Sequence, residues 1–370
     1  MIHRALQDFA FTSSAHTVAA TIRQGVAVIE SRIKYGLARL HGKAVVARLD
    51  GDIESHVVPA AYAKGAILTH NLAMKRILIV GCGDIAMRVA PWLRGHCQLF
   101  GLTRRAEQFA ELRTAGITPL PGDLDVRASL ARIAGLADVV LHLAPPSGKH
   151  TCDLRTRHLL AALSHTRPER SRRRALPKRL IYISTSGVYG DCGGAQISET
   201  HPLHAQTARA QLRVNAEQQI RNWAKRNHVI ASILRVPGIY AAGRLPLERL
   251  RIGTPAITHK EDSHTNHIHA DDLARIIIMA LRNGKPNRTY HTSDDSEMKM
   301  GEYFDAVADA YDLPRPPRLP RAEVEHSVSP ALWSFMNESR RLTNARMKRE
   351  LKIQLRYPTV ADALASITDA

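Results

Sequence analysis

The stretch that most constrains the fold is a short apolar run that ends in a glycine turn and continues as a helical pattern. Ile77 to Val80 is apolar and mostly β-branched, as in a strand buried on both faces of a parallel sheet. The chain turns at Gly81-Cys82-Gly83, and Ala86 lies where a small residue keeps the next helix close to the strand. This order predicts the first strand, turn and helix of a dinucleotide-binding unit, with the phosphates at the helix N-terminus.

The composition is that of a globular chain with ample core. At 370 residues, 44% hydrophobic and 23% charged, it predicts one large domain or two modest ones. No apolar run approaches about 20 residues, the length that spans a bilayer, so we expect no membrane segment. The four cysteines are widely spaced and form no C-x-x-C motif, which favours free thiols and a cytoplasmic location.

The net charge of +18 raises the question of nucleic-acid binding. The densest basic run, Arg167–Arg174, lies between a helix-like segment and a strand and has no interleaved aromatic residues to stack on bases. We interpret it as a solvated loop, and this interpretation disfavours a nucleic-acid partner.

The chain divides by pattern into three parts. Residues 1–73 do not connect clearly to the rest of the chain, and Met74 directly precedes the basic pair before the first strand. We therefore expect 1–73 to be an extension upstream of the functional start, or else a poorly ordered appendage. Residues 74–244 should form the dinucleotide-binding domain, and 245–370 a smaller lobe interleaved with it. Helical patterns in that lobe cover 245–251, 273–281, 301–311 and 339–351.

The end of the second predicted strand indicates which dinucleotide fits. Thr103-Arg104-Arg105 follows the glycines by about 20 residues, where an NAD site places an acid against the ribose 2′-hydroxyl. Two guanidinium groups suit a 2′-phosphate instead, because arginine presents a planar donor fork to phosphate oxygens. The pattern favours NADP(H) over NAD(H) and leaves NAD open; the alternative is that both arginines point into solvent.

Two later strand ends complete the predicted cofactor site. Asp123 follows the third strand, where an acid accepts a hydrogen bond from the adenine amino group, and Ala144-Pro-Pro-Ser147 follows the fourth, beneath the nicotinamide ribose. The predicted fold is a doubly wound parallel α/β sheet of the NAD(P)-binding Rossmann type with a smaller C-terminal lobe. We expect its cofactor contacts from Gly81, Gly83, Asp84, Ile85, Arg104, Arg105, Asp123, Leu124, Leu143 and Ala144.

Four further motifs resemble one family. They are Arg179-Leu-Ile-Tyr-Ile-Ser-Thr-Ser-Gly-Val-Tyr-Gly190, Ser198-Glu-Thr-His-Pro202, Ile233-Leu-Arg-Val-Pro-Gly-Ile-Tyr240 and Asn266-His-Ile-His-Ala-Asp-Asp-Leu-Ala274. Over roughly residues 75–360 the chain resembles the extended short-chain dehydrogenase/reductase superfamily, the NAD(P)-dependent epimerases and dehydratases, and within it an atypical YeeZ-like, nucleoside-diphosphate-sugar epimerase-like subgroup. The resemblance implies a catalytic hydroxyl at Thr185, and Pro237 beside the nicotinamide.

The chain departs from the family at its general acid/base. The family carries a Tyr-x-x-x-Lys pair ahead of a helical acid, and aligning that acid on Glu217 places Arg209 at the tyrosine and Arg213 at the lysine. Arginine cannot act as a base near neutral pH, although Arg213 can still hold a ribose or phosphate. Histidine titrates near neutrality, and the candidates to replace the tyrosine are His201, His204, His264, His267 and His269.

The resemblance implies an NAD(P)-dependent epimerase, dehydratase or reductase that acts on a nucleotide sugar or a related hydroxyl or carbonyl compound. Without the tyrosine, the alternative is a non-catalytic NADP(H)-binding sensor or scaffold. The histidines form no compact ligand set, so we expect no metal. The sequence does not determine the oligomeric state and is compatible with a homodimer.

Overall fold

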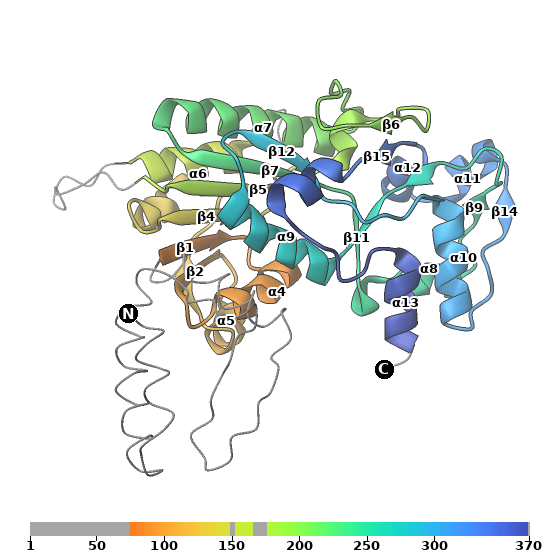
Figure 1. The fold of residues 1–370 in the computed structure, drawn as a ribbon, viewed down its shortest axis with the longest axis horizontal. Helices are drawn as coiled ribbons and strands as arrows, with labels where there is room; N and C mark the ends of the chain where they lie inside the picture. Colours follow the sequence, from red (N-terminus) through yellow and green to blue (C-terminus); the bar gives the residue numbers. More distant parts are fainter. Residues whose placement is uncertain (1–74, 149–151, 166–175, 369–370) are drawn as a thin grey trace, which may run out of the picture. The chain divides into compact units, whose positions relative to one another are not determined.

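The computed structural model describes residues 75–148, 152–165 and 176–368. Expectations for residues 1–73 and for the Arg167–Arg174 run lie outside the described residues. The described residues belong to one compact unit, 71–370. Its centre is a seven-stranded parallel sheet in the order β12-β7-β5-β4-β1-β2-β3 (Figure 1), made of β1 (Lys75–Val80), β2 (Cys97–Thr103), β3 (Ile117–Pro121), β4 (Val139–His142), β5 (Arg179–Thr185), β7 (Ile230–Val236) and β12 (Arg288–His291).

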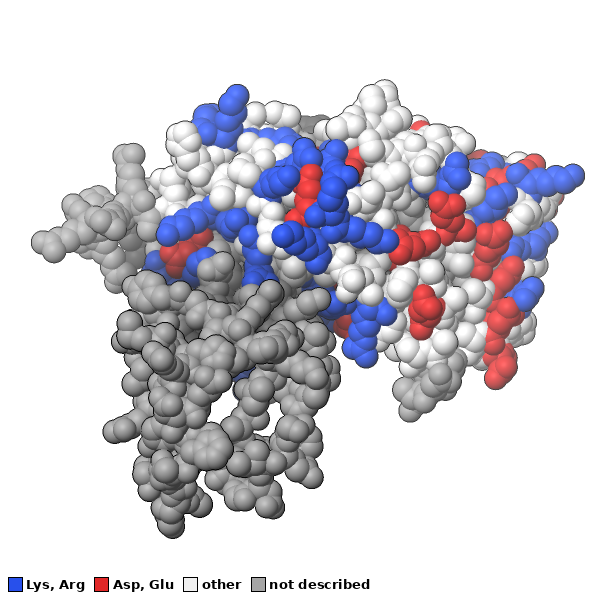
Figure 2. Space-filling model, in the orientation of Figure 1, with Lys and Arg blue, Asp and Glu red and all other residues white. Residues whose placement is uncertain are grey.

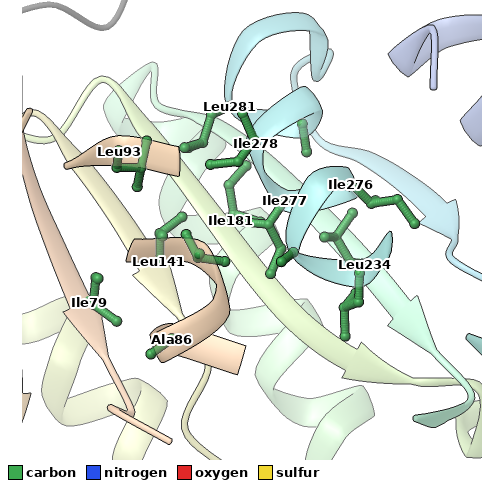
Figure 3. Packing of buried hydrophobic residues seen from close by; sticks show 14 of the residues in the cluster. Ile79, Ala86, Leu93, Leu141, Ile181, Leu234, Ile276, Ile277, Ile278 and Leu281 are labelled. Atoms are coloured by element: carbon green, nitrogen blue, oxygen red, sulfur yellow. The ribbon is translucent and has the colours of Figure 1, made fainter. Parts of the chain in front are cut away.

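Both faces of this sheet are covered, which explains why its strands are almost continuously apolar. In β1, Ile77 and Ile79 pack into one core, and Leu78 and Val80 pack into the other. Figure 3 shows the first core, where strand side chains meet α4 and α9. The helices around the sheet are α4 (Asp84–Leu93) and α9 (Ala270–Asn283) on that face, α6 (Leu154–Ser164) and α7 (Ala208–Asn227) on the other, and α5 (Phe109–Thr114) after β2.

This arrangement confirms the predicted doubly wound α/β fold. The chain winds outward from β1 through β2 to β3, then crosses back to β4 on the other side of β1. In such sheets ligands bind where the winding reverses, outside the carboxyl ends of the strands. That position lies between the ends of β1 and β4.

A smaller lobe follows β7 and has a core of its own, to which Tyr240, Tyr303 and Phe304 contribute. It is interleaved with the sheet, because α9 and β12 return to the sheet between its segments. Its helices are η6 (Ala242–Arg244), α8 (Leu247–Arg251), α10 (Met300–Ala310), α11 (Arg321–Ser327), α12 (Pro330–Met336) and α13 (Val360–Thr368). Short two-stranded sheets are formed by β8 (Gly238–Tyr240) with β11 (His267–His269), β9 (Ala256–Ile257) with β14 (Arg318–Leu319), β10 (His264–Thr265) with β13 (Met298–Lys299), and β6 (Gln196–Ile197) with β15 (Arg341–Leu342).

The helix expected over Ser339–Leu351 is wrong. Arg341–Leu342 is a strand that pairs with β6, and only Met347–Leu351 forms a short π-helical turn, η7. The backbone N–H of Leu342 donates to the Asn266 side chain at 2.8 Å. Because this N–H bonds to a segment distant in sequence, it does not form the hydrogen bond to residue i−4 that an α-helix requires.

Candidate functional site

The turn after β1 carries two glycines with different roles. Gly81 has φ +98°, and a Cβ on it would lie 2.6 Å from the backbone nitrogen of Ala144. The ends of β1 and β4 therefore approach so closely that only glycine fits. A Cβ on Gly83 would meet no atom within 4 Å. Open space over the start of α4, together with the N–H groups of its first turn, fits the pyrophosphate of a dinucleotide.

The first residue of α4 is an acid, Asp84, which two arginines neutralise. Arg88 Nε lies 2.9 Å from Asp84 Oδ1, and Arg244 Nη1 lies 3.0 Å from Asp84 Oδ2. Arg88 also pairs with Asp271 at the start of α9. The carboxylate is thus balanced, so it does not oppose an approaching phosphate. Arg244 also joins the first turn of α4 to the smaller lobe.

A cavity of about 270 Å³ lies at the carboxyl ends of the strands on the β1–β3 side. Arg104 lines it and lies 3.7 Å from Asp123, measured from Nη1 to Oδ2. Gln108 and Arg155 also line it, although no sequence pattern identified them. Arg155 forms two hydrogen bonds to Asp125, of 2.8 and 2.7 Å. The predicted cofactor residues in this wall are Gly81, Arg104, Arg105, Asp123, Leu124 and Ala144.

The other predicted cofactor residues lie outside this wall. Gly83, Asp84, Ile85 and Leu143 belong to the turn, the start of α4 and the end of β4. Arg213 on α7 points to β5, where its Nη1 donates to the carbonyl of Ile183 at 2.6 Å and to the Tyr182 hydroxyl at 3.1 Å. In this arrangement Arg213 supports the strand that carries Thr185.

A larger cavity, of about 510 Å³, lies at the carboxyl ends of β5 and β7 and extends under the smaller lobe. Thr185, Arg209 and Pro237 all line it, so the predicted catalytic hydroxyl and the tyrosine-equivalent residue share one site. Thr185 Oγ1 accepts a hydrogen bond from the N–H of Gly187 at 3.2 Å. This bond fixes the hydroxyl oxygen and leaves its own proton available for donation to a ligand.

Beneath this cavity a buried polar network fixes α7 against the sheet. Glu217 accepts two hydrogen bonds from Arg235, of 3.1 and 2.7 Å, and one from Ser184 at 2.6 Å. Arg235 also donates to the Tyr189 hydroxyl, which is hydrogen-bonded to His291. Burial raises the pKa of Tyr189 to about 12. Tyr189 therefore has a structural role here and does not replace the absent tyrosine.

Of the five candidate histidines, His264 and His267 line the larger cavity. His267 is only 4% exposed and stacks on Tyr303, with the ring centroids 4.1 Å apart. Burial lowers its pKa to about 3, so the imidazole is neutral. The backbone N–H of Asp294 donates to the carbonyl of His267 at 2.8 Å, and burial raises the pKa of the Asp294 carboxyl to about 7. Tyr240 also lines the cavity, and its hydroxyl donates to the carbonyl of Thr359 at 3.3 Å.

The arginines that follow β8 separate into two groups. Arg244 and Arg249 line the larger cavity, whereas Arg251 lies outside its wall and pairs with Glu248 at 3.7 Å. Burial lowers the pKa of Arg249, which indicates a partly desolvated cation. The sequence could not distinguish these three arginines, because helical spacing alone does not show which side faces a cavity.

Figure 2 shows a group of basic side chains over the middle of the visible face, with acidic side chains among them. Basic residues of the described chain are often paired with acids, as Arg288 is with Glu350 and Lys348 with Asp295, each at 2.5 Å. Within the described residues, no helix has the length and apolarity to cross a membrane. Nor does any cluster of three or more His, Cys, Asp or Glu side chains in that part of the chain have the arrangement of a metal site.

Comparison with protein families gives one match. Residues 77–292 match the model of the NAD dependent epimerase/dehydratase family. This range contains the glycine turn, Thr185, Arg209 and Pro237. No curated protein matches the chain significantly.

Solved structures share the fold over most of the described chain. A conserved protein of unknown function from Silicibacter pomeroyi is 25% identical, with a TM-score of 0.66, and the match covers 80% of this chain and 99% of that one. The UDP-glucuronic acid 4-epimerase of Bacillus cereus, solved with UDP-glucuronic acid and NAD, is 17% identical, with a TM-score of 0.61 and coverages of 80% and 98%. The UDP-glucose 4-epimerase of Thermotoga maritima, solved with UDP-glucose, is 16% identical, with a TM-score of 0.63 and coverages of 80% and 97%.

Proposed function

Because the chain belongs to the NAD-dependent epimerase/dehydratase family, we propose that it binds a nicotinamide dinucleotide and acts on a hydroxyl or carbonyl group of a nucleotide sugar or related compound in the cytoplasm. The observation that carries this proposal is the larger cavity, where Thr185 and Pro237 share a wall with Arg244 and Arg249. A hydroxyl beside the cofactor crevice suits a sugar oxygen, and the lobe arginines suit a diphosphate. Within the family we assign the chain to the atypical YeeZ-like subgroup, on the resemblance that its combined motifs carry.

The cofactor that we propose is NADP(H). Arg104 and Arg105 lie in the wall of the smaller cavity, where a guanidinium suits a ribose 2′-phosphate. The open space at Gly83 and the start of α4 would take the pyrophosphate. When bound, the nicotinamide would supply or accept the hydride at its C4. Thr185 would hold the substrate oxygen through the proton that its bond with Gly187 leaves available.

The test follows the absorbance of reduced nicotinamide with a panel of nucleotide sugars. A slow change is expected in the wild type. Thr185→Ala should abolish it, and Thr185→Ser, which keeps a hydroxyl, should retain much of it. Turnover that is unchanged in Thr185→Ala would refute the assigned role of Thr185.

One observation favours a second function, that of a non-catalytic NADP(H) sensor or scaffold. Arg209 stands at the tyrosine position, and the nearby His267 is neutral, with a pKa of about 3, so neither group is an ordinary acid/base near neutral pH. Tight NADP(H) binding without turnover across the whole panel would establish the sensor and exclude the enzyme.

A further inference from the structure

Arg209 is a cation without a counter-ion in the wall of the larger cavity. Its guanidinium carbon lies 4.3 Å from the centroid of the Phe335 ring on α12. Among the residues that the structure describes, this stacking is its only specific contact, with no hydrogen bond or ion pair to any acid. Burial lowers the pKa of Arg209, and the charge of Arg213 lowers it further. By accessible surface Arg209 is exposed to the solvent of the cavity, so its donors are open to a ligand, and an anion that accepts them would offset the nearby charge of Arg213.

The acid whose charge acts on Arg209 does not serve as that anion. Glu338 raises the pKa of Arg209 through its charge, but it pairs with Arg340, with Nη1 and Oε2 2.7 Å apart. Arg340 donates from the same nitrogen to the carbonyl of Gly190, also at 2.7 Å. Glu338 is thus held by another arginine, and the donors of Arg209 are left for a ligand.

The position of Arg209 on its helix also points to an anion. It is the second residue of α7, a 20-residue helix whose first turn contains no acid. A cation near a helix N-terminus opposes the helix dipole, whereas an anion there is attracted by the dipole and by the arginine together. An anionic ligand in this part of the cavity would therefore remove an unfavourable arrangement that the chain alone leaves in place.

We propose that the substrate carries a carboxylate beside its reacting carbon and that Arg209 binds this carboxylate. The inference rests on the proposed function, because it takes Thr185 as the group that holds the reacting oxygen. Arg209 lines the same cavity as Thr185 and comes from α7, whereas Arg244 and Arg249 come from the lobe. The planar guanidinium matches the two oxygens of a carboxylate, and stacking on Phe335 fixes its plane. The substrate class is a nucleotide-linked sugar acid.

The test compares UDP-glucuronic acid with UDP-glucose, which differ only in a carboxylate and a hydroxymethyl group. Calorimetry with the full-length chain and NADPH should show that the wild type binds UDP-glucuronic acid about tenfold or more tightly. Arg209→Gln should reduce this ratio to about one, because it removes the charge, and should leave the affinity for UDP-glucose unchanged. Arg209→Lys should give an intermediate ratio. Arg251→Gln, outside the cavity, should keep the wild-type ratio. Equal wild-type affinities, or a preference that persists in Arg209→Gln, would overturn the inference.

A second measurement separates this inference from the nucleotide-sugar proposal. If neither nucleotide sugar binds, the proposed nucleotide-sugar function fails. The carboxylate site is then tested by comparing the melting temperature of the protein in sodium glucuronate with that in glucose plus an equal concentration of sodium chloride. A rise in the melting temperature of the wild type that Arg209→Gln lacks would support the carboxylate site by itself. Identical melting temperatures with glucuronate and glucose would overturn it.

Discussion

Two helix starts face the crevice at the carboxyl edge of the sheet, and they differ in chemistry. The start of α4 is open at Gly83, and its one acid, Asp84, is neutralised by two arginines. The start of α7 places Arg209 in the larger cavity without a counter-ion. The first region has the open space and the helix N-terminus that fit a pyrophosphate. The second carries Arg209 at the position where the resemblance to the family predicts a tyrosine. We propose that cofactor binding and the family's usual proton transfer depend on separate residues, so that one can change while the other is kept.

The largest expected effect concerns two matched ion pairs, one in each region. Glu217→Gln leaves Arg235 buried without a counter-charge and should lower the free energy of unfolding by about 3–5 kcal/mol. Asp123→Asn removes the pair with Arg104, whose side chain is 63% exposed, and should cost less than about 1 kcal/mol. Urea unfolding of both variants measures the difference. Similar losses would show that the network under α7 is not the stronger anchor.

The two glycines of the turn provide a matched pair within the cofactor region. Gly81→Ala should destabilise the fold by about 2–4 kcal/mol, because φ is positive there and the added Cβ overlaps backbone. Gly83→Ala should change stability by less than about 1 kcal/mol. Thermal unfolding compares them, and equal losses would contradict the two roles assigned to these glycines.

The stability of the fold should also depend on pH through Asp294, which follows β12. Its pKa is about 7 in the folded chain and about 3.9 when unfolded, so the folded state binds the proton more tightly. The stability that this gives is complete below about pH 4 and is lost as the pH rises to about 7. Asp294→Asn cannot ionise, and its unfolding free energy relative to the wild type should rise by about 1 kcal/mol per pH unit across this window. Stability curves that stay parallel from acid to neutral pH would refute the shift.

The smallest effect concerns cofactor choice. Arg104→Ala should weaken NADPH binding by about tenfold and leave NADH binding nearly unchanged, because only NADPH has the 2′-phosphate. Arg94→Ala, on an exposed residue outside the cavity wall, serves as the control. Fluorescence titration with both nucleotides measures the affinities. An equal loss for NADH and NADPH would place Arg104 away from the 2′-phosphate.

The local fold around the start of α4 was the more predictable of the two because its signals are local. The apolar run, the glycine turn and the residues at the ends of β2 and β3 follow one another within about fifty residues, in the order that the fold requires. Family motifs at fixed spacing also predict a catalytic hydroxyl at Thr185 and place Arg209 at the tyrosine position, and the structure brings these two residues to one cavity.

Contacts between segments distant in sequence were not predictable. The stacking of His267 on Tyr303, the contact of Arg209 with Phe335 and the pairing of β15 with β6 each join such segments. The last of these explains why the helix expected over 339–351 is absent. No periodicity or propensity contains this information, because tertiary contacts override local preference.

NADPH affinity, measured by fluorescence titration of wild type, Gly83→Ala and Arg209→Gln, tests the separation of the two regions most directly. The wild type should bind NADPH. Gly83→Ala should weaken binding by about tenfold or more, because its Cβ enters the pyrophosphate space. Arg209→Gln should bind like the wild type, because Arg209 serves the substrate. Loss of NADPH binding in Arg209→Gln, or wild-type affinity in Gly83→Ala, would contradict the separation.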